Sequence, residues 1–156
     1  MAKAASAKAI SNKARGKSSS QTYVLEQQIG FLLRQVSQRH AAIFAEHIGS
    51  NLTPTQWAAL VKLAEAGPCS QNQLGRFTAM DVATIKGVID RLTARGLTET
   101  SADPEDGRRL MVALTRAGQA TVEKTCPLAI EITEETLAPL KAKEREVLLA
   151  LLAKLM

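Results

Sequence analysis

The stretch DVATIKGVIDRLTARGLTETSADPEDGRRLMVALT, residues 81–115, decides the fold of this 156-residue chain. Its first half repeats apolar residues at helical spacing behind an N-capping aspartate and stops at a glycine, which predicts one amphipathic helix. Its second half holds two short extended segments, 97–101 and 109–114, joined by a charged segment that contains Pro104 and Gly107. The stretch therefore predicts a helix followed directly by a β-hairpin with a long charged tip.

A short helix precedes this unit. Ser70 is placed to cap it, Gln73 follows three residues later, and the helical pattern continues to about Phe77. A turn over residues 78–80 leads to the next helix. Two short helices joined by a tight turn and followed by a hairpin predict a winged helix-turn-helix, in which the second helix reads DNA. Ser70 and Gln71, at the start of the first helix, belong to the predicted DNA-binding set.

The exposed face of the second helix fits a DNA groove. It is small at its centre, at Gly87, and carries Thr84, Lys86 and Arg91 at its edges. Small residues allow close approach to the major groove, while the longer polar side chains reach base edges and phosphates. An isolated helix with an ordinary solvated face would look similar, so the neighbouring hairpin decides in favour of DNA. The residues predicted to face the core are Val82, Ile85, Val88, Ile89 and Leu92.

The hairpin tip carries Arg108 and Arg109 beside Asp103, Glu105 and Asp106. Such mixed charges are unremarkable on a solvated loop. In a wing, one of the arginines is expected to enter the minor groove, where the potential is most negative. Asp106 is expected to pair with a basic side chain and to orient the hairpin against the reading helix.

Helices are also predicted on both sides of the winged unit. Apolar residues at helical spacing predict a long helix over 23–48, and a capping box with a proline starts another at Thr53. Thr115 is expected to cap a helix that runs to about residue 136 and that Pro127 kinks or breaks. An amphipathic helix closes the chain. The predicted fold class is mainly α with a small β-hairpin wing.

The net charge of +5 comes from the first twenty residues. This segment holds five Lys and Arg and no acid, whereas residues 21–156 hold fifteen charges of each sign. Ala, Ser and Lys dominate the segment, so it has little apolar surface to offset the entropy of ordering. Residues 1–20 are therefore expected to form a flexible basic arm that adds phosphate contacts without sequence preference.

Several classes of protein are not expected. No run approaches the roughly 18 apolar residues of a membrane span, and the start lacks the apolar core of a secretory signal, which favours a cytoplasmic location. Cys69 and Cys126 lack further ligands at metal spacing, although the position of Cys69 just before a helix start leaves oxidation open as a switch. Two histidines, no Gly-rich phosphate loop and no nucleophile beside a base predict neither an enzyme nor a cofactor or metal.

Three segments resemble the MarR family of bacterial transcriptional regulators. Residues 106–115 fit the family's wing signature, Asp-x-Arg, five residues, then Leu-Thr. Residues 52–57 look like the start of its second helix, and residues 89–97 look like the end of its recognition helix. The resemblance extends over residues 23–156 in the family's order and spacing.

The resemblance implies a homodimer that places two winged domains on successive major grooves of a pseudo-palindromic operator and represses transcription until a ligand releases it. It implies a single domain over 21–156, with DNA binding in 53–115 and helical dimerisation segments in 21–50 and 116–156. The implied partners are double-stranded DNA and a second copy of the chain. A winged module used for architecture or protein interaction, without sequence reading, is the alternative.

Within the family, residues 67–72, 79–81 and 84–91 look most like regulators of nicotinic acid catabolism. This implies a small aromatic carboxylate as the effector, such as 6-hydroxynicotinate. Other members respond to phenolic acids or to aromatic acyl-CoA thioesters, and both stay open as alternatives here.

One histidine suggests where a ligand binds. His40 lies in the apolar stripe of the helix 23–48, and a buried imidazole needs a polar partner. A backbone carbonyl or a side chain across the dimer would satisfy it. Alternatively it meets a ligand carboxylate or ring heteroatom, with Arg39 at the edge of the stripe and Phe44 or Trp57 as flat walls. His47 lies on the same side, but no carboxylate or thiolate in the stripe completes a metal site.

Overall fold

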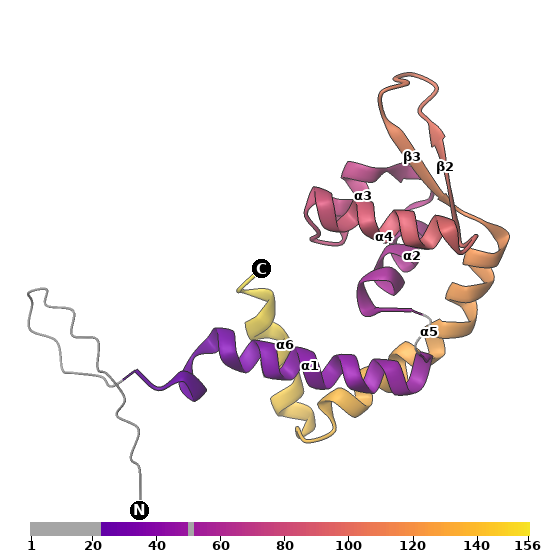
Figure 1. Cartoon of the computed structure of the whole chain (residues 1–156). Coiled ribbons are helices and arrows are strands. Elements are labelled where there is room, and N and C mark those ends of the chain that lie inside the picture. Colours follow the sequence, from indigo (N-terminus) through magenta and orange to yellow (C-terminus); the bar gives the residue numbers. More distant parts are fainter. Residues whose placement is uncertain (1–22, 50–51) are drawn as a thin grey trace, which may run out of the picture.

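The computed structural model describes residues 23–49 and 52–156, so the predicted arm over 1–20 lies outside the described residues. Helices dominate, and the fold class expected from the sequence is confirmed. Figure 1 shows two parts, with α2–α4 and the sheet in one and α1 with α6 in the other, while α5 runs between them. The elements are η1 (Leu25–Gln27, a 3-10 turn), α1 (Ile29–Ile48), α2 (Pro54–Ala66), β1 (Cys69–Ser70), α3 (Gln71–Phe77), α4 (Val82–Ala94), β2 (Thr98–Ala102), β3 (Leu110–Leu114), α5 (Arg116–Leu137) and α6 (Ala142–Ala153).

The predicted caps start the helices of the winged unit. Thr53 forms a capping box with Gln56 at the start of α2, and the Ser70 hydroxyl accepts from the Gln73 amide at 3.3 Å at the start of α3. The Asp81 carboxylate accepts from the Thr84 amide at 2.8 Å. Each cap satisfies an amide that the first turn of a helix leaves without a partner.

The core of the winged unit is aliphatic. Four of the five predicted core residues of α4 are buried, whereas Val82 is 67% exposed. Val82 is the first residue of α4 and lines an open cavity with Asn72 and Arg76, so the prediction for this residue was wrong. The largest fully buried side chains of the chain are Leu60, Leu74, Ile85, Ile89, Leu92, Ile132, Val88, Val112 and Thr98.

The sheet has three antiparallel strands in the order β1-β3-β2. The hairpin is confirmed, with Thr98 opposite Leu114 and Ala102 opposite Leu110. The sequence analysis missed β1, in which Cys69 pairs with Val112. A strand of two residues has no periodicity of its own, and this one exists because it pairs with β3.

Two long helices differ from their predicted form. The first begins at Ile29 instead of residue 23, because a 3-10 turn and the extended residue Gln28 precede it. The helix α5 continues through Pro127, so the predicted break is wrong, and Figure 1 shows α5 following a bent course. Proline removes only one helical hydrogen bond, and a helix absorbs this loss by bending.

The start of α5 is locked to the base of the wing. Thr115 donates its hydroxyl proton to the Gly96 carbonyl at 2.6 Å and its amide proton to the Leu97 carbonyl at 3.2 Å. Gly118 is buried at this junction, and a Cβ added there would stand 2.0 Å from the Leu97 carbonyl oxygen. Residue 118 therefore has to be glycine for α5 to approach the wing this closely.

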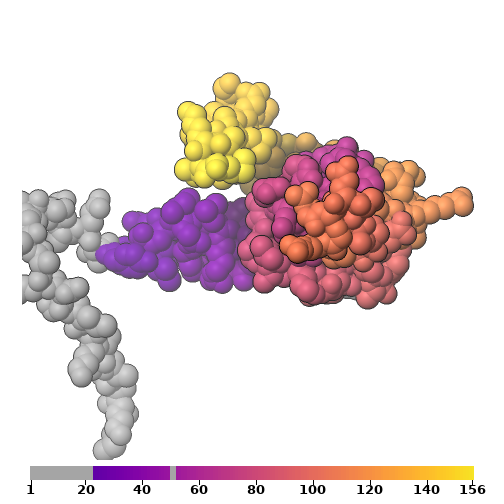
Figure 2. Space-filling view, turned by 90° about the horizontal axis from the view of Figure 1, so that it is seen from above, coloured from indigo at the N-terminus to yellow at the C-terminus, as the bar shows by residue number. Residues whose placement is uncertain are grey.

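Much apolar surface stays uncovered on α1 and α6. Ile29 is 63% exposed and Val36 is 58% exposed, although both belong to the predicted apolar stripe. Figure 2 shows α1 and α6 extending from the winged unit as two separate arms. Within the described residues, none of the helices is long and apolar enough to cross a membrane. Further exposed apolar side chains on these helices are Leu32, Leu33, Val147, Leu149 and Leu151.

Gly118→Ala is expected to lower the free energy of unfolding by about 3 kcal/mol, because the added methyl group meets backbone that cannot move independently. Gly87→Ala is the matched control. A Cβ at residue 87 meets only ordinary contacts with the Arg91 side chain, so alanine should stabilise the helix by about 1 kcal/mol. Urea unfolding followed by circular dichroism measures both. Equal stabilities for the two variants would contradict the tight junction.

Candidate DNA-binding surface and ligand cavity

The predicted reading face of α4 is free of the core. Thr84, Lys86 and Arg91 are exposed and Gly87 is half-buried. Thr84 donates its hydroxyl proton to Asp81 at 2.7 Å, and these hydrogen bonds hold the pKa of Asp81 below its ordinary value. The four predicted residues therefore lie together on one outward-facing side of the helix.

Lys86 and Arg91 are held differently. The Lys86 ammonium pairs with Asp90 one helical turn later at 2.6 Å. The Arg91 guanidinium lies against Gly87, with Nη2 3.5 Å from the position of a β-carbon at that residue. Gly87 thus leaves room for a flat cation close to the helix surface. Both cations are exposed, and exposed ion pairs exchange partners at little cost in free energy.

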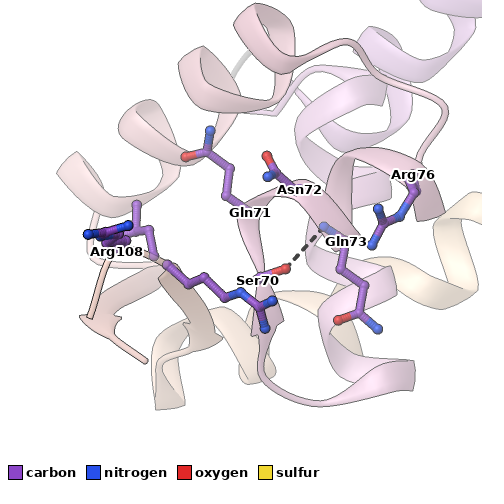
Figure 3. Close-up of a pocket in the computed structure, with 8 residues that line it drawn as sticks. Ser70, Gln71, Asn72, Gln73, Arg76 and Arg108 are labelled. Carbon is purple, nitrogen blue, oxygen red and sulfur yellow. Dashed lines mark hydrogen bonds between the residues drawn. The ribbon is translucent and has the colours of Figure 1, made fainter. Parts of the chain in front are cut away.

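A polar cavity of about 400 Å³ lies between α3 and the wing. Figure 3 shows side chains from the start of α3 surrounding it together with Arg108 from the wing. Three arginines, Arg76, Arg108 and Arg109, line it without a carboxylate in the lining. A concave surface with this donor set fits an anion such as a DNA phosphate. Its lining residues are Ser70, Gln71, Asn72, Gln73, Arg76, Arg108, Arg109 and Leu110.

The sequence analysis found half of this lining and missed the rest. Ser70, Gln71 and the two wing arginines were predicted, whereas Asn72, Gln73 and Arg76 were not. Residues 72, 73 and 76 fall on one side of a helix, so their spacing on α3 was the available signal. That side becomes part of a cavity only because the wing folds back beside it.

Asp106 has a different partner from the one expected. Its carboxylate accepts from the Arg108 amide at 3.1 Å and lies 3.4 Å from Nε of Arg109. Pairing with a basic side chain is thus observed, but among the described residues the partners belong to the wing tip and not to α4. Asp106 shapes the tip itself, because a short side chain at a turn reaches its own neighbours first.

A second cavity, of about 220 Å³, lies where α1, α2 and α5 meet. Three of the four residues predicted to bind ligand, His40, Phe44 and Trp57, line it. The two aromatic rings pack edge to face, with centroids 6.3 Å apart and planes at 68°. Trp57 donates its indole proton to the Thr125 hydroxyl at 2.9 Å, which fixes the ring. The remaining lining residues are Pro54, Ala58, Ala129, Ile132 and Thr133.

The partner of His40 lies within the chain. Nδ1 of His40 is 2.9 Å from the Thr136 hydroxyl oxygen on α5. A partner from the other protomer, one of the two structural explanations considered above, is therefore not needed for this nitrogen. The imidazole is half-buried, and its second nitrogen is available to the cavity that His40 lines.

Arg39 does not line the cavity. Its guanidinium donates to the Thr136 carbonyl at 2.8 Å and to the Glu135 carbonyl at 3.3 Å. The last carbonyls of a helix have no partner within the helix, and a guanidinium satisfies two of them at once. Arg39 therefore fastens α1 to the end of α5, a contact that the sequence did not reveal.

His47 and Cys69 offer no further site. His47 lies 2.7 Å from a Glu135 carboxylate oxygen and 3.6 Å from one of Glu131, both on α5. Even so, no group of three or more potential ligands is arranged for a metal within residues 23–49 and 52–156. Cys69 is buried, and burial raises the pKa of its thiol, which disfavours the thiolate that oxidation requires.

Comparisons with known proteins fit this arrangement. The MarR family model matches residues 52–110. The HTH-type transcriptional repressor NicR of Pseudomonas putida is 42% identical over 134 residues, which cover 85% of each chain. The chain belongs to the MarR family.

Two solved structures extend the likeness of this MarR-family chain to its fold. A probable transcriptional regulator from Pseudomonas aeruginosa is 61% identical, with a TM-score of 0.81, over 85% of this chain and 100% of that one. BpsR of Bordetella bronchiseptica, whose DNA binding is regulated by 6-hydroxynicotinic acid, is 44% identical, with a TM-score of 0.76. That match covers 83% of this chain and 98% of BpsR.

Arg39→Ala is expected to lower the free energy of unfolding by about 1 kcal/mol, because two helix-end carbonyls lose a charged donor at a solvated site. The control is Arg34→Ala on the same helix, where the guanidinium lies 5.4 Å from the centre of the Phe31 ring and should contribute about half as much or less. Urea unfolding without ligand or DNA gives both values. If Arg39→Ala left stability unchanged, the fastening of α1 to α5 would be refuted.

Proposed function

We propose that the chain is a DNA-binding transcriptional repressor that acts as a homodimer and leaves its operator when a small aromatic carboxylate binds. The observation that carries the proposal is the placement of two surfaces on one helix. The wing ends where α5 begins, and the aromatic cavity lies against α5 two to three turns further on. The likeness to the repressor NicR and to BpsR supports this function.

In this proposal α4 enters the major groove. Thr84, Lys86 and Arg91 reach bases and phosphates, while Gly87 lets the helix approach closely. Ser70 and Gln71 contact the DNA backbone beside it. Arg108 or Arg109 enters the minor groove, where a single guanidinium gains most from the negative potential. The wing tip, shaped by Asp106, presents these arginines.

The dimer is proposed to form through the helices outside the winged unit. Residues 21–50 and 116–156 supply the dimerisation region, and residues 53–115 supply the DNA-binding part. The exposed apolar side chains on α1 and α6 support this division, because a second copy would remove them from water. The two reading helices would then contact successive major grooves of an operator in the cytoplasm.

The cavity favours a single-ring acid as the effector. A volume of about 220 Å³ is below the range of about 300–1,000 Å³ typical for drug-sized ligands, and an acyl-CoA thioester is larger still. Phe44 and Trp57 offer flat walls, and His40 offers a polar edge. A hydroxylated pyridine carboxylate such as 6-hydroxynicotinate matches this set, as the likeness to BpsR suggests.

Release from DNA requires a difference in affinity. The ligand has to bind the arrangement that cannot bind DNA more tightly than the one that can, and a tenfold effect needs about 1.4 kcal/mol. The helix α5 offers the physical route, since it joins the cavity to the wing. No catalytic role is proposed, because the cavity lining holds one imidazole and no nucleophile or carboxylate beside it.

Lys86→Ala and Arg108→Ala are each expected to weaken operator binding by about 1–3 kcal/mol. Mobility-shift titrations against the protein's own promoter measure this effect, with Lys143→Ala on α6 as the control that should bind normally. Deleting residues 1–20 should flatten the salt dependence by a log-log slope of roughly 0.9 for each lost phosphate contact while preserving sequence preference. Random DNA that competes as well as the operator would indicate an architectural module instead.

The chain's single tryptophan reports on the cavity. Adding 6-hydroxynicotinate should change the Trp57 fluorescence and release the operator over the same concentration range, because Trp57 lines the cavity. His40→Ala should weaken the ligand about tenfold or more, as expected when a charge-assisted hydrogen bond is lost. Nicotinamide, which lacks the carboxylate, is the control ligand. A response of equal strength to nicotinamide would contradict carboxylate recognition.

A further inference from the structure

We propose that Thr136 is a positioning residue that fixes the tautomer of His40, so that the ligand cavity presents an N–H donor to an anionic ligand. This inference rests on the proposed function of the cavity. Thr136 itself is not a lining residue of the cavity. It acts through the hydrogen bond between its hydroxyl oxygen and Nδ1 of His40, which measures 2.9 Å.

The geometry assigns different roles to the two ring nitrogens. Thr133, one helical turn before Thr136, lines the cavity, whereas Thr136 lies beyond it. The Nδ1 edge of the His40 ring therefore meets Thr136, and the opposite edge, with Nε2, is the one left for the cavity. A ligand would meet Nε2.

The direction of the hydrogen bond follows from the neighbours of Thr136. Other threonine hydroxyls of α5 give their protons to carbonyls four residues earlier, as Thr121 does at 2.7 Å and Thr133 at 3.0 Å. Within the described part of the chain, the Thr136 hydroxyl has His40 as its hydrogen-bond partner and no such carbonyl. Its proton is thus available to Nδ1. A neutral imidazole that accepts at Nδ1 carries its proton on Nε2.

Arg39 holds the turn that carries Thr136. It is adjacent to His40 on α1, and its guanidinium binds the carbonyls of Glu135 and Thr136. Two consecutive residues of α1 therefore grip the same turn of α5, one through the backbone and one through the Thr136 side chain. This grip keeps the hydroxyl in register with the imidazole.

The fixed tautomer selects the chemistry of the ligand. An Nε2–H group between aromatic walls donates to a carboxylate oxygen, and such charge-assisted bonds are the stronger ones. The opposite tautomer would turn a lone pair toward the carboxylate and repel it. Thr136 therefore favours anionic ring compounds over neutral ones of the same shape without touching them.

Thr136→Val removes the hydroxyl and keeps the side-chain shape. In ligand-free protein, ¹⁵N-edited NMR of the two imidazoles should show Nε2–H for His40 in the wild type and a mixture of tautomers in the variant. A His47→Gln variant assigns the signals. Calorimetry should show about three- to tenfold weaker binding of 6-hydroxynicotinate, the loss that one net hydrogen bond produces. Thr136→Ser should restore both properties, and Thr121→Val on the same helix should leave both unchanged.

The outcomes separate this inference from the proposed effector. An unchanged tautomer and unchanged affinity in Thr136→Val, or a wild-type His40 protonated on Nδ1, would overturn the role of Thr136. A tautomer that shifts in Thr136→Val, with no binding of 6-hydroxynicotinate to any form, would support the positioning role and refute the proposed effector. Loss of affinity that Thr136→Ser fails to rescue would mean that residue 136 acts through packing, against the proposal.

Discussion

The close approach of α5 to the base of the wing is the constraint on which the rest of the structure depends. A glycine at residue 118 lets the helix backbone lie against the Leu97 carbonyl, and Thr115 fastens the same point with two hydrogen bonds. From there α5 runs to the cavity and ends where Arg39 binds it. One helix therefore sets the position of the reading surface relative to the ligand cavity, and a change at either end is felt at the other.

The DNA-binding surface depends on where its charges stand more than on their sum. Residues 76–116 hold seven basic and six acidic side chains. Several of the acids have local structural roles, since Asp81 caps α4, Asp90 pairs with Lys86 and Asp106 shapes the wing tip. The arginines that line the cavity beside α3 are therefore left with a surface of positive character, although the winged unit has almost no net charge.

Local structure was largely predictable because it depends on neighbours in the sequence. The caps at Thr53, Ser70, Asp81 and Thr115 were predicted correctly, and so were the hairpin and the buried face of α4. The failures share one cause. The strand β1 exists only through its pairing with β3, and the helix α5 tolerates Pro127, since its packing outweighs the loss of one hydrogen bond.

The sequence by itself determined the order of the elements, the family and the residues that can read DNA or line a cavity, because spacing and capping are local properties. Only the tertiary structure decided the partners of those side chains. Arg39 was expected at a ligand but binds carbonyls 96 and 97 residues away, and Thr136, 96 residues from His40, supplies its hydrogen bond. Contacts across such distances in the chain depend on how α1 packs on α5, which periodicity within either helix does not specify.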